Sequence, residues 1–256
     1  MAYHPDALDN RDPELIARAL PPLEAFNAHY FRVQYQGSEH VPRGPVLFVG
    51  NHNGGIAGPD LLCTLAHLWR LLDPKSPLYA LAHDFVMRQF TPLGRVLQRF
   101  GALRANRANA THVLGAGGQV LVYPGGDLEA YRHFARRNEV VILPRTGFVQ
   151  VAREMGAPIV PIVAHGAHRS AFIFSEGKRL ASALNMQSWA RLQRFPLALA
   201  LPWGIAPGPW LPYLPLPFRV RLRILAPTFV TEADDAAEVA QHIQNSMQQS
   251  LREMSA

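Results

Sequence analysis

A histidine and an aspartate stand on a glycine-rich segment, residues 51–60, that lies between two apolar runs. The run at 46–49 predicts a buried strand, and the run at 61–65 predicts the start of a helix. Turns at strand ends are where α/β proteins place reactive side chains. A neutral imidazole takes a proton from a hydroxyl, and a carboxylate behind it fixes the tautomer. We therefore interpret His52 as a general base oriented by Asp60. The alternative is that His52 is a backbone-bonded turn residue and Asp60 a helix N-cap.

A second polar segment follows another predicted strand. Residues 121–132 read as a strand, then Tyr123-Pro124-Gly125-Gly126, then polar and basic residues that include Arg132. By itself this pattern is also typical of an ordinary β-turn, because Pro-Gly is a common turn signal. Farther along, residues 157–163 predict a strand with a proline at a position where ladder hydrogen bonding is interrupted.

These segments lie between predicted strands and helices that alternate along the chain, which favours one α/β domain. Residues 13–32 are expected to be helical, with Pro21-Pro22 dividing a short helix from a longer one. After a strand that ends near Gly37, further strands are expected at 46–49, 78–82, 119–123, 159–164 and 219–224. Helices are expected at 60–72, 85–90, 93–100, 106–114 and 148–155. We divide the chain into an N-terminal helical segment and first strand (1–36), a core (37–230) and an amphipathic C-terminal helix docked on that core (231–256).

Composition limits the class of protein. The 256 residues carry a net charge of +6, and only 17% of them are charged, which suits an anionic membrane surface or an anionic substrate. The basic residues form no dense tract, so we expect no nucleic-acid partner. The single cysteine, Cys63, excludes internal disulfides and fits a reducing compartment. The N-terminus lacks the pattern of a signal peptide.

A proline-rich segment without charged side chains, residues 195–218, has two interpretations. Its prolines exclude a membrane-spanning helix. It is either a buried irregular segment that covers the core, or a surface that faces a membrane or lines an acyl chain. In the second interpretation Trp203, Trp210 and Phe218 make the lipid contact, because aromatic side chains favour the bilayer interface.

Four sequence blocks in order resemble the glycerolipid (lysophospholipid) acyltransferase family, of the 1-acylglycerol-3-phosphate acyltransferase type. They are Asn-His with the later Asp60, Gly-Ala-Leu-Arg at 101–104, Tyr-Pro-Gly-Gly at 123–126 and Ile-Val-Pro-Ile at 159–162. The resemblance runs from about Gly37 to Pro227 and is closest to a branch with Pro-Gly-Gly in the third block. It implies a glycerolipid acyltransferase-like fold, a single α/β domain with a mixed central sheet flanked by helices.

The resemblance also implies a mechanism. His52 would deprotonate an acceptor hydroxyl, Asp60 would orient the imidazole, and the alkoxide would attack an acyl thioester without an acyl-enzyme. The oxyanion would be stabilised by backbone N–H groups or amide side chains near four residues of the first block. These are Asn51, Asn53, Gly54 and Gly55.

Two departures from the family pattern bear on the substrate. Seven residues separate His52 from Asp60, where the usual block has four, and Gly125 stands where the family has a glutamate that helps to hold glycerol phosphate. The second departure leaves room for a neutral or bulkier alcohol. Four arginines remain candidates for holding a phosphate or the donor's pantetheine arm, or are solvated surface residues. They are Arg104, Arg107, Arg132 and Arg145.

We therefore expect an O-acyltransferase that moves a fatty acyl group from acyl-CoA or acyl carrier protein to a lipid-like hydroxyl. A lysophospholipid, a glycerolipid and a long-chain alcohol are all open as acceptors. The alternatives are a non-catalytic lipid-binding protein and a lipid hydrolase or transacylase on the same fold. No cofactor and no metal are expected, since His165 and His168 have no third ligand at a recognisable spacing. Membrane lipid is the expected partner, at the cytoplasmic face of the membrane, and the oligomeric state is open.

Overall fold

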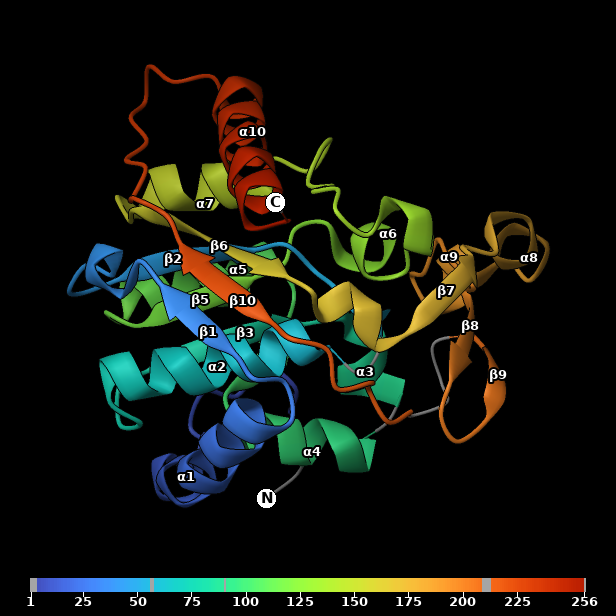
Figure 1. The fold of residues 1–256 in the computed structure, drawn as a ribbon. Coiled ribbons are helices and arrows are strands. Elements are labelled where there is room, and N and C mark those ends of the chain that lie inside the picture. Colours follow the sequence, from blue (N-terminus) through green and yellow to red (C-terminus); the bar gives the residue numbers. More distant parts are fainter. Residues whose placement is uncertain (1–3, 56–57, 90, 209–212, 256) are drawn as a thin grey trace.

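A mixed seven-stranded sheet forms the centre of the computed structural model, which describes residues 4–55, 58–89, 91–208 and 213–255 (Figure 1). The strand order is β1-β10-β6-β2-β5-β3-β4. All neighbours are parallel except β10 and β6, which pair antiparallel. The strands are β1 (Gln34–Gln36), β2 (Val46–Gly50), β3 (Leu78–Ala82), β4 (Ala102–Arg104), β5 (Gln119–Val122), β6 (Ile159–His165) and β10 (Arg221–Ile224). This architecture confirms the expected α/β fold with a mixed central sheet.

Helices cover both faces of the sheet because its central strands are apolar on both sides. In β2, Val46 and Phe48 belong to one core cluster, and Leu47 and Val49 belong to the other, as the two-residue period of a strand requires. The first cluster packs against α1 (Pro13–His29) and α2 (Pro59–Leu72). The second packs against α5 (Arg107–Gly115), α7 (Gly147–Met155) and α10 (Ala236–Ser255).

The C-terminal helix docks through one apolar face. Ile243, Met247 and Leu251 recur every fourth residue and are buried in the second cluster, which is the pattern of an amphipathic helix. The carboxylate of Asp235 accepts hydrogen bonds from the backbone N–H groups of Ala237 and Glu238 and so caps the start of α10.

The N-terminal helix differs from the prediction. Pro21 and Pro22 lie inside α1, which runs unbroken from Pro13 to His29, so the expected division into two helices is wrong. Consecutive prolines remove backbone donors and cost helix stability. Burial of Ile16 and Leu20 in the first core cluster offsets that cost, because tertiary packing outweighs local propensity.

Residues 166–220 form an excursion between two neighbouring strands of the main sheet, and we call it the β6–β10 insert. It contains a three-stranded antiparallel sheet in the order β7-β8-β9. Its elements are β7 (Phe172–Ser175), α8 (Lys178–Ala183), α9 (Met186–Trp189), β8 (Leu197–Ala200) and β9 (Gly204–Pro207). In Figure 1 these elements project to the side of the main sheet. Sequence analysis did not predict them, because prolines and glycines interrupt the apolar runs.

Strand order decides where the sequence blocks meet. Strand β2 lies between β5 and β6 and is parallel to both, so the chain leaves all three at the same edge of the sheet. The carboxyl edge of parallel strands is the usual ligand site of α/β sheets. At this edge α6 (Gly126–Ala130) follows β5 and α3 (Asp84–Gln89) follows β3. Helix α4 (Thr91–Arg99) contacts α3 and the edge strand β4. Within the described ranges, no helix combines the length and the apolar character needed to cross a membrane.

Candidate active site

His52 and Asp60 meet directly at the carboxyl end of β2. The Nδ1 atom of His52 lies 2.9 Å from Oδ2 of Asp60. The Asp60 side chain is fully buried, whereas that of His52 is 23% exposed. With its proton on Nδ1, the imidazole donates to Asp60 and leaves Nε2 as a base for a substrate hydroxyl. The alternative role of Asp60 as a helix N-cap is wrong, because Gly58 occupies the cap position of α2.

Glycines fold the chain between these two side chains, so the longer spacing does not keep them apart. Gly54, Gly55 and Gly58 all have positive φ, at +75°, +60° and +42°, a region that side chains with a Cβ rarely adopt. A Cβ on Gly54 would also lie 2.8 Å from the backbone oxygen of Ala167. We refer to residues 51–55 as the His52 turn.

The surroundings of His52 favour its protonated form. Burial on its own lowers the pKa of His52. The charge of Asp60, the hydrogen bond that His52 donates to it and the charge of Glu129 act in the opposite direction and outweigh burial, so the pKa is raised above its usual value. An imidazole of this kind is a stronger base than a free histidine.

The backbone of His52 is held on both sides by residues that follow the glycine pair of the third block. The carboxylate of Glu129 accepts the N–H of His52 at 2.7 Å. The guanidinium of Arg132 donates to the C=O of His52 at 2.7 Å and also to Oδ1 of Asn53. Both side chains are fully buried. Sequence analysis did not predict a role for Glu129. The signal available was its position three residues before Arg132, which is about one helical turn.

The glycine pair makes room for charged side chains. A Cβ on Gly125 would lie 2.4 Å from Oε2 of Glu129, and a Cβ on Gly126 would lie 2.5 Å from Nη1 of Arg145. The absence of a side chain at Gly125 therefore leaves space for the carboxylate of Glu129 on α6. Burial raises the pKa of Glu129 to about 7, although the nearby Arg132 cation and the two backbone N–H groups that it accepts pull it down. The ring of Tyr123 lies beside His52, with 4.9 Å between centroids.

Two side chains of the β6–β10 insert also bind the His52 turn. The N–H of Gly54 donates to Nδ1 of His168 at 3.2 Å, and Nε2 of His168 donates to the C=O of Arg132 at 2.9 Å. Burial and the Arg132 charge hold the pKa of His168 well below its usual value, so the ring is neutral and fits both roles. The hydroxyl of Tyr213 donates to the C=O of Gly54. Across the described residues no group of three or more His, Cys, Asp or Glu is placed to hold a metal.

Most of the predicted oxyanion donors are already engaged. The amide of Asn51 pairs with the backbone N–H and C=O of Ala164 at 2.7 and 3.1 Å. Asn53 donates its backbone N–H to Asp60 and its side-chain N–H to the C=O of Asn51. The Gly54 N–H binds His168 as described above. These contacts contradict an oxyanion role for the two amide side chains and for the N–H groups of Asn53 and Gly54 in this conformation, and they leave the backbone N–H groups of Asn51 and Gly55 as candidates.

The four candidate arginines have different surroundings. Arg132 has no exposed surface, and its guanidinium N–H groups donate to oxygens of the protein itself. The expectation that Arg132 holds a phosphate or the donor is therefore wrong. Arg104 pairs with Asp6 and Asp84. Arg107 is an exposed partner of Glu154. Arg145 reaches the third block itself, where it donates to the C=O of Pro124 at 2.7 Å, and it remains partly exposed.

The proline-rich segment is not a buried cover over the core. It forms β8 and β9, and the side chains of Trp203 and Phe218 are half-exposed. Trp210 lies outside the described residues. The opposite face of this small sheet lines a narrow pocket that also contains Gly55 of the His52 turn and Tyr131.

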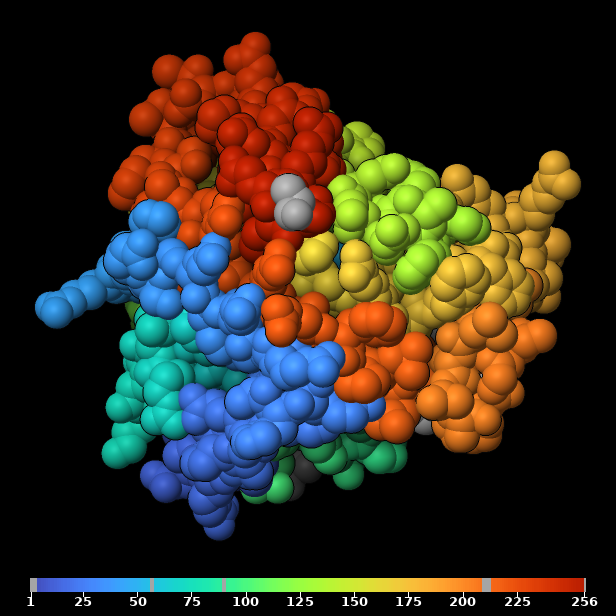
Figure 2. All heavy atoms as spheres, in the orientation of Figure 1, coloured from blue at the N-terminus to red at the C-terminus, as the bar shows by residue number. Residues whose placement is uncertain are grey.

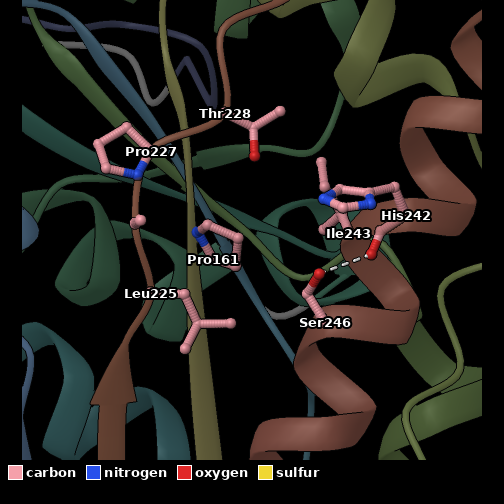
Figure 3. Close-up of a pocket in the computed structure, with 8 residues that line it drawn as sticks. Pro161, Leu225, Pro227, Thr228, His242, Ile243 and Ser246 are labelled. Carbon is pink, nitrogen blue, oxygen red and sulfur yellow. Dashed lines mark hydrogen bonds between the residues drawn. The ribbon is translucent and has the colours of Figure 1, made fainter.

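A separate pocket of about 240 Å³ lies between α10 and the end of β10 (Figure 3). Its walls are Pro161 and residues 225–228 on one side and His242, Ile243 and Ser246 on the other. It shares no lining residue with the His52 turn and has no paired acid and base. It is therefore not the candidate active site.

The sequence pattern that defines the family described as Acyltransferase matches residues 32–165, which is more than half of the chain and includes every residue of the His52 turn. The chain belongs to the acyltransferase family. The fold of this acyltransferase is similar to that of a 1-acyl-sn-glycerophosphate (LPA) acyltransferase, PlsC, from Thermotoga maritima. The TM-score is 0.55 with 17% identity, covering 96% of this chain and 84% of that one.

Relatives of the acyltransferase fall into two groups. An uncharacterized protein of Mycobacterium tuberculosis is 28% identical over 90% of this chain, which spans 64% of that protein's length. Diacylglycerol O-acyltransferase 2 of Xenopus laevis is 32% identical over 58% of this chain and 43% of its own, and the Homo sapiens protein of that name is 27% identical over 58% and 40%. The resemblance to glycerolipid acyltransferases is thus confirmed, while assignment to a Pro-Gly-Gly branch stays a prediction.

Proposed function

We propose that this acyltransferase moves a fatty acyl group from an acyl thioester to the hydroxyl of a lipid acceptor, with His52 as the general base. The observation that carries the proposal is the 2.9 Å contact between Nδ1 of His52 and the buried carboxylate of Asp60. It directs the other ring nitrogen, Nε2, toward an incoming hydroxyl. Membership of the acyltransferase family supplies the reaction class.

The chemical step follows from this geometry. Nε2 of His52 takes the acceptor's hydroxyl proton as the oxygen attacks the thioester carbonyl, and Asp60 stabilises the imidazolium. Collapse of the tetrahedral intermediate forms the ester and breaks the C–S bond. The imidazolium then returns the proton to the leaving thiolate, so the enzyme ends in its starting state. Coenzyme A and acyl carrier protein both supply such a thiol, and no resident cofactor takes part.

We propose the class of acceptor from the similarity of this chain to other proteins and from the residues of the site. The similar proteins whose names state an activity are glycerolipid acyltransferases, which favours a glycerolipid or lysophospholipid hydroxyl. Gly125 removes the family glutamate that helps to hold glycerol phosphate. Arg145, at the third block and partly exposed, is the cation best placed to meet a phosphate. A phosphorylated acceptor would use the Arg145 guanidinium as the partner of its phosphate, whereas a neutral acceptor would not.

An acyl-transfer assay with palmitoyl-CoA tests the proposal. The acceptors are lysophosphatidic acid, other lysolipids, diacylglycerol and a long-chain alcohol, and free CoA is followed together with the lipid product. We expect His52→Ala to lower turnover by about a thousandfold, the scale of lost general-base catalysis, with an unchanged circular dichroism spectrum. The matched control is His112→Ala, an exposed histidine on α5, which should keep full turnover.

Each result has a defined meaning. Turnover retained by His52→Ala removes the general-base role. CoA release without any lipid product replaces transfer with hydrolysis. If Arg145→Ala raises KM for lysophosphatidic acid but not for diacylglycerol, the phosphate contact is assigned to that residue.

A further inference from the structure

The β6–β10 insert carries most of the large apolar side chains that are exposed among the described residues. Among the described residues, 17 large apolar side chains are exposed, and 11 of them lie in the insert, which is about a fifth of the chain. Single exposed apolar residues are ordinary in a monomer, but a contiguous group indicates an interaction surface.

The exposed side chains are arranged in register across the small sheet. Phe172 on β7 pairs with Leu199 on β8, and Leu199 pairs with Ile205 on β9. Their exposed fractions are 40%, 48% and 61%. Side chains in register on one face of a sheet stand side by side, so these three form a continuous apolar row. Leu201 and Trp203, both about half-exposed, extend it at the β8–β9 turn.

The opposite face of the same sheet is closed. Ile173, Ala198 and Ala206 are each one residue away from the exposed row, pair in register with one another and are almost fully buried. They line the narrow pocket that also contains Gly55 of the His52 turn. The small sheet therefore separates an exposed apolar face from a wall of the candidate active site.

The insert that carries this apolar surface is also positively charged. The insert contains six basic residues and one acid, Glu176, and it therefore carries five of the six net positive charges of the chain. Glu176 itself lies within ion-pair distance of Lys178, Arg194 and Arg136, so one carboxylate is shared by three cations. Figure 2 shows the insert as a projecting lobe of the molecule.

We propose that the exposed face of the β7–β8–β9 sheet docks on an anionic lipid bilayer. Apolar side chains with a tryptophan at a turn insert at the headgroup boundary, where aromatic rings are favoured. Basic residues of the same insert, such as Lys178 and Arg179 on α8, attract anionic lipids. A protein partner would also cover apolar surface, but an insert with six basic residues and one acid fits a sheet of anionic headgroups.

The orientation that results would serve acyl transfer. With the outer row in the lipid, the inner row and the His52 turn lie directly above the bilayer, where a lipid hydroxyl is available. The docking proposal extends the proposed acyl transfer and rests on it. Membrane binding is measured without turnover, so the docking proposal and the proposed function can fail separately.

Vesicle co-sedimentation of the full chain tests the surface. The vesicles contain phosphatidylcholine alone or equal parts of phosphatidylcholine and phosphatidylglycerol. We expect the wild type to bind the anionic vesicles and to be released by salt. The double variant Leu199→Ser/Ile205→Ser should weaken that binding about tenfold or more, since it removes two apolar side chains from the interface. Lys178→Glu/Arg179→Glu on α8 should weaken it about tenfold as well.

A matched control and two further measurements decide the outcome. Phe229→Ser removes the most exposed large side chain of the group, which lies outside the insert, and should bind like the wild type. Thermal unfolding checks that the variants fold, and transfer to a detergent-dispersed acceptor should persist in them. The proposal is overturned if the wild type binds neither vesicle or if the insert variants bind equally well. It is also overturned if the serine variant instead abolishes a dimer seen by light scattering, which would make the face a contact between two copies.

Discussion

The carboxylate of Glu129 accepts the backbone N–H of His52 at 2.7 Å. It joins two segments that are 77 residues apart in the chain, and its other oxygen accepts the N–H of Val141 at 2.9 Å. Asp60 binds the imidazole, whereas Glu129 binds the main chain from which that imidazole projects. In the proposed mechanism the geometry of the base therefore depends on both acids.

Removing Glu129 should lower catalysis by displacing His52. We expect Glu129→Ala to reduce kcat by about 10- to 100-fold, because a small displacement of a reacting group has a cost of this size. Steady-state kinetics should show the loss in kcat with little change in the KM for the donor. Glu154→Ala, which removes an exposed acid on α7, is the control. An unchanged kcat in the Glu129 variant would show that the turn keeps its shape without this contact.

The pH dependence of transfer should report the raised pKa of His52. The neutral imidazole is the base, so activity falls as the pH drops through this pKa, and the acid limb of kcat/KM should lie above 6.5, the usual histidine value. In Asp60→Asn the carboxylate that favours the imidazolium is gone. The limb should then move to lower pH, together with a large loss of rate. An acid limb that stays at the same pH in this variant would assign the titration to another group.

Gly125→Ala should destabilise the protein. Its new Cβ would lie 2.4 Å from both Glu129 Oε2 and the backbone oxygen of Val141, and the backbone oxygen cannot move aside easily. We expect the free energy of unfolding to fall by about 1–3 kcal/mol, the usual cost of overpacking. Denaturant unfolding measures it. Gly147→Ala, where a Cβ would have no neighbour within 4 Å, should be close to neutral, and equal losses in both variants would refute the steric explanation.

Arg132 should be far more important for stability than its exposed counterparts. Arg132→Met leaves the buried carboxylate of Glu129 without its nearby cation and several carbonyl groups without a donor. Each buried polar group left without its partner costs about 1–3 kcal/mol, so we expect the free energy of unfolding to fall by several kcal/mol. Arg107→Met, which removes an exposed ion pair with Glu154, should cost about 0–1 kcal/mol. Thermal or urea unfolding of the two variants gives the comparison directly.

The sequence was informative where local patterns are strong. Strand β2, helix α2 and the meeting of His52 with Asp60 could be anticipated, because an apolar strand, a glycine turn and an acid at a helix start are all local signals. Contacts between residues that follow neighbouring strands could not be anticipated from the sequence. Glu129 and His168 bind the His52 turn only because β5 and β6 flank β2, and no spacing in the chain records that order.

The roles of the polar residues were harder to predict than their positions. Asn51 and Asn53 lie in the turn as expected, yet their amides bind the protein itself. Arg132 is next to the site but buried. A sequence shows that a residue can donate a hydrogen bond, whereas the packing around it decides whether a donor is left for a substrate.

The β6–β10 insert leaves and rejoins the main sheet at facing positions, since His165 pairs with Arg221 in register. An excursion whose two ends are side by side can change in length and sequence without altering the sheet that carries it. His168 and Tyr213 link this excursion to the His52 turn. In evolution the His52 turn can therefore be retained while the exposed face of the insert is exchanged, which makes the insert a replaceable module.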